Sequence, residues 1–202
     1  MKKIALAAVL LFCAAGLSAQ NIRSNELQDF SSLVLSGKLN VTLEPSGHNG
    51  IEIAMVDADM SRMEWGVKGG KLSIRLKANP IGPTGGSADV KIYYMKLSSI
   101  EASGGASVGS LAAVRTGIFT LRATGGANIA LELYTSDLTV TGEGNSVLLL
   151  TGSSDYITAK ATTKGKVDAR NLQTKTAMVN TQLAGEIYVW GSDKIDARAT
   201  TN

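Results

Sequence analysis

The sequence predicts an all-β protein built as a parallel β-helix, a solenoid with coils of about 20 residues. The main observation is a short phrase that recurs through the second half of the chain, first as IEASGGA and then as LRATGGA. Its copies begin at Ile100, Leu121, Leu138, Ile157, Ala177 and Ile195. A period near 20 residues is typical of a stacked solenoid, in which one turn cannot bury its apolar face alone.

Each copy also alternates between apolar and polar residues with a period of two. The first position is aliphatic and the third is small and apolar, whereas the positions between and after them are mostly polar. The third positions are Ala102, Ala123, Val140, Ala159, Val179 and Ala197. This pattern indicates short strands with one buried face, and it lacks the three- and four-residue spacing of a helix. An antiparallel β-sandwich is the alternative fold.

The fifth position of each copy predicts a corner of the coil. It is occupied by Gly104, Gly125, Gly142, Ala161, Thr181 and Ala199. Glycine suits a corner because it adopts positive φ without steric cost. A second short apolar run follows in most copies, as in 129–133, 147–149 and 187–189, so each coil should contain two or three strands.

Residues 20–98 are strand-like but show no clear repeat. Alternating runs at 39–43 and 51–55, and at 65–67 and 72–76, are separated by turn residues and predict hairpins. Such a segment would cap the first coil of the repeats in 99–202 and protect its strand edges. We therefore expect one β-solenoid domain over 20–202.

Composition excludes one class of partner. The chain has 202 residues, of which 44% are apolar and 18% are charged, and its formal net charge is +3. Two of the basic residues, Lys2 and Lys3, lie in a segment that we expect to be removed, which leaves +1. No Lys/Arg cluster is large enough to hold a nucleic-acid backbone.

Residues 1–19 are predicted to be a secretory signal peptide. A basic start is followed by an apolar run and by small residues before a cleavage site between Ala19 and Gln20. The apolar run is too short for a comfortable membrane span. Cys13, the only cysteine, could accept a lipid, but the large Phe12 before it argues against this. We expect an exported protein in the periplasm, on the outer membrane surface or outside the cell, without a transmembrane span.

The order of three motifs resembles a known bacterial family. The pattern FxxLxLxGxLxVxL begins at Phe30, GKLxI begins at Gly70, and IxASGGASV begins at Ile100. Together they resemble the head GIN domain of putative auto-transporter adhesins, over nearly all of the mature chain. The resemblance implies a right-handed parallel β-helix and a secreted protein, and it carries no catalytic or ligand residues. Family members commonly end with a further turn and strand, so the last coil here is expected to be incomplete.

The search for chemistry yields no catalytic, metal or cofactor site. His48, the only histidine, lies in a turn, where we expect a solvated side chain and not a catalytic base or ligand. Asp57 and Asp59 lack the further oxygen ligands of a calcium loop. We predict that the protein is not an enzyme and needs no cofactor.

Two sets of residues remain as candidates. Asp168 with Arg170, and Asp196 with Arg198, would form a site only if they met in one groove, and they support the alternative of a polysaccharide lyase or hydrolase. The weak candidates for surface binding are Tyr93, Tyr94, Tyr188 and Trp190. The preferred function is a non-enzymatic envelope protein, an adhesin or binding module, that binds a glycan or a protein through an outer sheet face.

Overall fold

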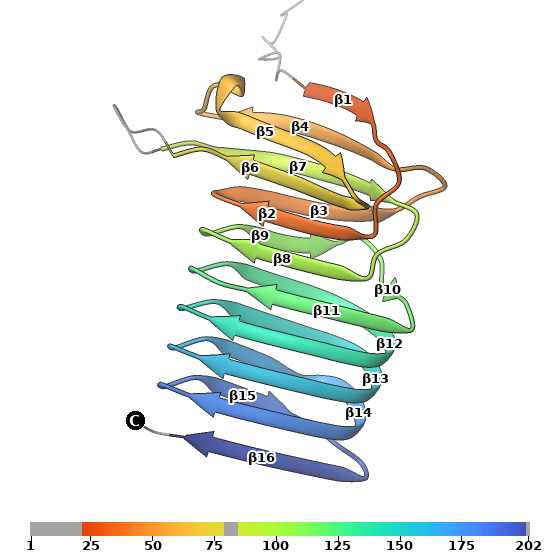
Figure 1. The fold of residues 1–202 in the computed structure, drawn as a ribbon, viewed down its shortest axis with the longest axis vertical. Helices are drawn as coiled ribbons and strands as arrows, with labels where there is room; N and C mark the ends of the chain where they lie inside the picture. The colour runs from red at the N-terminus through yellow and green to blue at the C-terminus, as the bar shows by residue number, and fades with distance from the viewer. Residues whose placement is uncertain (1–21, 79–84, 201–202) are drawn as a thin grey trace, which may run out of the picture.

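A computed structural model describes residues 22–78 and 85–200. Figure 1 shows a flattened stack of coils, with one sheet at the front and one at the back. The described chain contains no α-helix, only a 3-10 helix at Met60–Arg62 (η1), and no helix in it could cross a membrane. The predicted signal peptide, its cleavage site at Ala19 and Gln20, and Cys13 lie outside the described residues.

The predicted solenoid is confirmed in the second half of the chain. Three long strands each run along the back sheet, turn a corner and continue along the front sheet (Figure 1). They are β12 (Asn128–Glu143), β13 (Val147–Thr162) and β14 (Lys166–Gln182). All three pair in parallel, as do β11 (Ile118–Ala123) and β16 (Lys194–Thr200) with their neighbours in the front sheet. Successive coils therefore present the same face of each strand to the core.

The inward residues were predicted correctly, but their register in one coil was not. Leu121 lies beside Val140 and not beside Leu138, whose partner is Phe119. The error is a slip of two residues. Because strand side chains alternate with a period of two, such a slip keeps every residue on its proper face, and the alternation cannot reveal it.

The tight corners confirm the expectation for Gly104 and Gly125, both of which have positive φ. The slip moves the third corner from Gly142, a buried strand residue, to Gly144 and Asn145. In the next two coils the corner residues with positive φ are Thr163 with Lys164, and Leu183 with Ala184. The later corners thus hold the glycine conformation without glycine, and the Ala161, Thr181 and Ala199 positions lie within strands.

The N-terminal part contains two further parallel coils that the sequence did not reveal. One consists of β2 (Ser32–Ser36) and β3 (Leu39–Pro45), stacked on β8 (Ser99–Ser103) and β9 (Ser107–Ser110). The other consists of β6 (Lys71–Leu76) and β7 (Ser87–Tyr94), stacked on β2 and β3. The stacking order therefore departs from the chain order, which hides the period.

Antiparallel strands lie over these coils at the N-terminal end of the stack (Figure 1). The hairpin expected between residues 65–67 and 72–76 exists, since β5 (Met63–Lys68) pairs with β6. The other expected hairpin does not: β7 lies between β3 and β4 (Gly50–Val56), with Val90 between Val41 and Ile53. β1 (Ile22–Glu26) pairs with β4.

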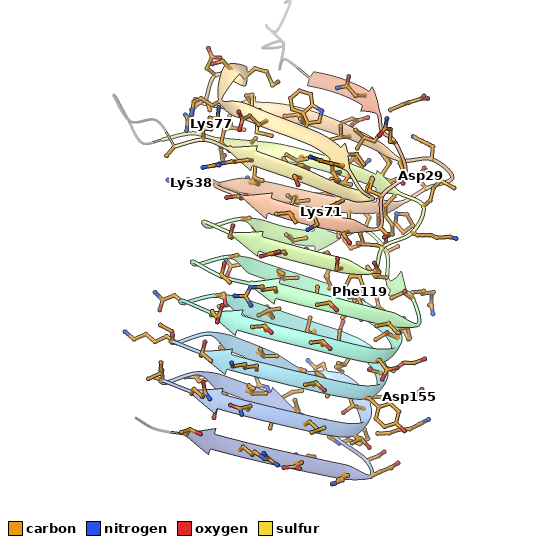
Figure 2. All side chains as sticks on the ribbon, viewed as in Figure 1. Asp29, Lys38, Lys71, Lys77, Phe119 and Asp155 are labelled. Carbon is orange, nitrogen blue, oxygen red and sulfur yellow. The ribbon has the colours of Figure 1, made fainter. Side chains whose placement is uncertain are left out.

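One continuous core of buried apolar residues runs from Phe30 to Ala177 between the two sheets. Phe119, labelled in Figure 2, is among its largest fully buried side chains. The core thins toward the last coil, where Ile195 is 50% exposed. Burial of this apolar stack stabilises the coils, since the mature chain expected from the sequence holds no cysteine.

Candidate functional site: a polar groove along one corner

The broad corner, where β12, β13 and β14 pass from the back sheet to the front, holds a column of hydroxyl residues. Thr135, Ser154 and Thr174 occupy equivalent positions in successive coils. Ser154 donates to the carbonyl of Tyr156 at 2.8 Å, and Thr135 donates to that of Gly117 at 2.9 Å. The hydroxyls thus bind backbone carbonyls at the turn, in addition to the backbone amides that the Gly117 carbonyl already accepts.

Sequence reasoning missed this column. With Thr116, which precedes β11, its members recur at the same 19- or 20-residue period as the core positions. The 19- or 20-residue spacing of these hydroxyl residues is visible in the sequence. It does not stand out when the repeats are aligned on the motif that begins at Ile100, because hydroxyl residues are also common at exposed positions.

Two columns of accessible side chains flank these hydroxyls and line a groove of about 560 Å³. We call it the corner groove. Its residues are Thr116, Tyr134, Thr135, Ser136, Ser153, Ser154, Asp155, Gln173, Thr174, Lys175, Trp190 and Ser192. Tyr134, Ser153 and Gln173 lie side by side in consecutive coils. Figure 2 shows Asp155 at this corner, pointing away from the stack.

The corner groove contains two aromatic residues, which lie in different coils. Tyr134 lies in β12, and Trp190 directly follows β15 (Glu186–Val189), three strands further along the back sheet. With neighbouring strands roughly 4.8 Å apart, the strands that carry the two residues are three such steps apart. Trp190 is 49% exposed, so its ring is accessible to a ligand.

The charges in the corner groove are locally neutralised. The Lys175 ammonium lies 2.7 Å from the Asp155 carboxylate, and this hydrogen-bonded pair raises the pKa of Lys175. The Arg115 guanidinium stacks on the Tyr134 ring at 4.1 Å from its centroid. The Tyr134 hydroxyl donates to Glu132 at 2.9 Å, which raises the pKa of Tyr134. What the groove offers a ligand is therefore hydroxyls, an amide, the exposed ring of Trp190 and the half-buried ring of Tyr134.

The four aromatic candidates lie in three different places. Trp190 lies in the corner groove. Tyr188 is exposed on the back sheet, with Lys166 and Arg170 each close to its ring. Tyr93 also lies on the back sheet, where its hydroxyl donates to Glu52 at 3.1 Å.

The structure corrects the expectation that Tyr94 is a surface-binding residue. Its side chain is only 5% exposed, and burial raises the pKa of its hydroxyl. It covers the core edge and offers no surface to a ligand. Its position in the alternating strand β7 explains the difference from Tyr93, since consecutive residues point to opposite faces.

The two acidic–basic pairs do not meet. Asp168 and Arg170 lie in the back sheet beside β15, whereas β16, with Asp196 and Arg198, belongs to the front sheet. Arg170 binds Asp168 at 2.6 Å, and this contact lowers the pKa of the Asp168 carboxyl. Each pair is a local ion pair, so the polysaccharide-cleaving alternative loses the shared groove that it required.

The remaining titratable candidates have structural contacts. His48 stacks on Tyr93, with ring centroids 5.6 Å apart, and its Nδ1 lies 3.0 Å from the Ser46 hydroxyl. The Asp59 carboxylate accepts from the Ser61 amide at 2.7 Å and caps the 3-10 helix, which lowers its pKa. Within residues 22–78 and 85–200, no three His, Cys, Asp or Glu side chains gather as a metal site would require.

Comparison with known proteins identifies the family. Residues 29–202 match the family described as "Putative auto-transporter adhesin, head GIN domain". The chain belongs to this family. The match covers both the repeats and the two N-terminal coils, and it agrees with the resemblance seen in the sequence. No curated protein matches the chain.

Several solved structures of bacterial proteins have a similar fold. A putative adhesin from Bacteroides fragilis is 17% identical with a TM-score of 0.72, over 89% of this chain and 93% of its own. A putative lipid binding protein from Parabacteroides distasonis is 16% identical with a TM-score of 0.69, over 92% and 95%. A putative adhesin from Parabacteroides merdae is 17% identical with a TM-score of 0.59, over 92% and 96%. At such identities the likeness shows the fold alone.

Proposed function

We propose that this member of the head GIN family is an exported, non-enzymatic binding protein that holds a glycan in the corner groove. The observation that carries the proposal is the combination of an exposed aromatic ring at Trp190, a half-buried one at Tyr134, and rows of hydroxyl and amide groups between them. Aromatic faces pack against the apolar faces of sugars, and the polar groups between them can exchange hydrogen bonds with sugar hydroxyls.

The repeating geometry of the corner suits a chain-like ligand. Equivalent polar side chains recur once per coil, so a glycan lying along the stack meets similar groups at each step. Repeat proteins commonly bind extended partners in this way. The Asp155–Lys175 pair leaves little net charge in the groove, which favours a neutral glycan over a highly acidic one.

A lipid is the less suitable ligand, although one structural neighbour is described as a putative lipid binding protein. An acyl chain requires an enclosed apolar cavity. The corner groove is open, and most of its lining residues carry hydroxyl, amide or charged groups.

A glycan array followed by calorimetric titration of the best ligand tests the proposal. Trp190→Ala and Tyr134→Ala should each weaken binding about tenfold or more, because aromatic anchors dominate such interfaces. Tyr188→Ala is the matched control, because Tyr188 is an exposed aromatic residue in β15, two residues before Trp190, and does not line the groove. Absence of glycan binding, or equal effects of the three variants, would overturn the proposal and leave a protein partner on an outer sheet face to be sought by pull-down.

Export is tested separately. Cell fractionation with intact-mass analysis should recover a chain that begins at Gln20, in the periplasm, on the outer membrane surface or in the medium. A mass corresponding to the full sequence in the cytoplasmic fraction would contradict export. A mass increased by a lipid on Cys13 would mean that the chain is anchored instead of released.

A further inference from the structure

Within residues 22–78 and 85–200, the layer formed by β15 and β16 has an unpaired strand edge in each sheet. Among the described residues, β16 pairs only with β14 in the front sheet, and β15 pairs only with β14 in the back sheet. Figure 1 shows β16 as the final strand of the stack. The outer edges of both strands thus present N–H and C=O groups that can form a ladder with another chain.

Apolar side chains gather at the same end. Ten large apolar side chains are exposed in the described structure, and five of them lie between residues 178 and 195. They are Met178, Leu183, Tyr188, Trp190 and Ile195. Ile195 occupies the inward position that is fully buried as Ala177 in the preceding coil. Ile195 therefore leaves the core partly uncovered at this end, whereas the other four side chains lie on the outer faces and corners of the last two coils. An incompletely covered core marks an interaction surface.

The charges on β16 select its partner. On its outward face the strand carries Lys194, Asp196 and Arg198. When two copies of β16 lie antiparallel about Ala197, Asp196 of each faces Arg198 of the other. Moving the centre by one residue, to Asp196 or to Arg198, places like charges opposite each other at that centre. Opposite charges across a ladder stabilise the pair and like charges destabilise it, so the strand is complementary to itself in its fully overlapped register.

We infer that a second copy of this protein docks end to end on this surface, with the two β16 strands antiparallel about Ala197. The contact is isologous, the same patch on both copies, and forms a closed dimer instead of an open filament. A two-fold axis perpendicular to the sheets brings β16 against β16 in the front sheet and β15 against β15 in the back sheet. The inference is independent of the glycan proposed for the corner groove.

Charge reversal tests the inference by sedimentation equilibrium. The protein should be dimeric, and Asp196→Arg or Arg198→Asp should each raise the dimer dissociation constant about tenfold, because either change creates two like-charge pairs. The double variant D196R/R198D restores opposite charges and should restore the dimer. Asp168→Arg is the matched control, since it changes the same Asp-Ala-Arg phrase in β14, which is paired on both sides. Melting curves establish that each variant is folded.

A cysteine cross-link tests the register. In a Cys13→Ser background, Ala197→Cys places two thiols on the two-fold axis, within disulfide distance. Ala199→Cys, two residues from the axis, separates the thiols by about four residues of strand, roughly 14 Å, and should not cross-link. A monomer at all concentrations, a dimer that survives the single charge reversals unchanged, or equal cross-linking by the two cysteine variants would overturn the inference.

Discussion

Thr139 and Val140 are adjacent in the chain, yet the Thr139 side chain faces water while Val140 is fully buried between Leu121 and Ala159 of the neighbouring coils. The contrast follows from the alternation of strand side chains. Substitutions at these two positions therefore test whether the side chains face the directions that the strand register requires.

Val140→Asp should cost several kcal/mol of unfolding free energy, on the order of a whole domain's stability, because it buries a carboxylate without a basic neighbour in its column. Thr139→Asp, one residue away, should cost about 1 kcal/mol or less. Thermal melts of both variants measure the difference. Equal losses would contradict the inward direction of the Val140 column.

The tight corners predict a stabilising substitution. Thr163 holds φ at 51°, a conformation that costs a β-branched residue roughly 1–2 kcal/mol. Thr163→Gly should raise the unfolding free energy by about 0.5–1 kcal/mol after the entropy lost by glycine is counted. Gly104→Ala, at the equivalent corner with φ 66°, should destabilise instead, since a Cβ there would lie 3.0 Å from the Gly37 amide nitrogen. Chemical denaturation of both variants measures these shifts in unfolding free energy. A Thr163→Gly variant that is less stable than the wild type would contradict the argument.

The hydroxyl column of the broad corner should contribute to stability. Ser154 is buried and its hydroxyl lies close to the carbonyls of Tyr156 and Ser136, so Ser154→Ala should cost about 1–2 kcal/mol by leaving them without this donor. The neighbour Ser153 points into the corner groove, and Ser153→Ala should change stability by about 0.5 kcal/mol or less. Urea unfolding of the pair is the measurement. A larger loss at Ser153 would mean that the column is not structural.

The Asp168–Arg170 pair predicts a dependence of stability on pH. Its hydrogen bond and charge hold the pKa of Asp168 below its ordinary value of 3.8 in the folded protein. The stabilisation is therefore complete well above pH 3.8 and is lost as the pH falls through the lower, folded pKa. Asp168→Asn should melt below the wild type at pH 7, and the gap should narrow below about pH 4. A gap that is constant from pH 7 to pH 2 would show that the ion pair contributes no linkage.

The residue pattern by itself determined the solenoid, its coil length and the direction of its core side chains. Ile100, Leu121 and Ile157 point inward as expected, because the alternation of apolar and polar residues is a local property that burial in any coil must respect. The same local signal located two corner glycines. The alternation could not determine which residues pair across neighbouring strands, since a slip of two residues leaves every side chain on the same face.

Tertiary structure alone decided which distant segments became neighbours. The insertion of β7 between β3 and β4 turns an expected hairpin into part of a parallel coil, and no local pattern distinguishes the two. The placement of Tyr134 and Trp190 along one corner also depends on the stacking of four strands. Such long-range pairings depend on the closure of loops and on the fit of side chains across coils. Neither can be deduced from the sequence adjacent to a given residue.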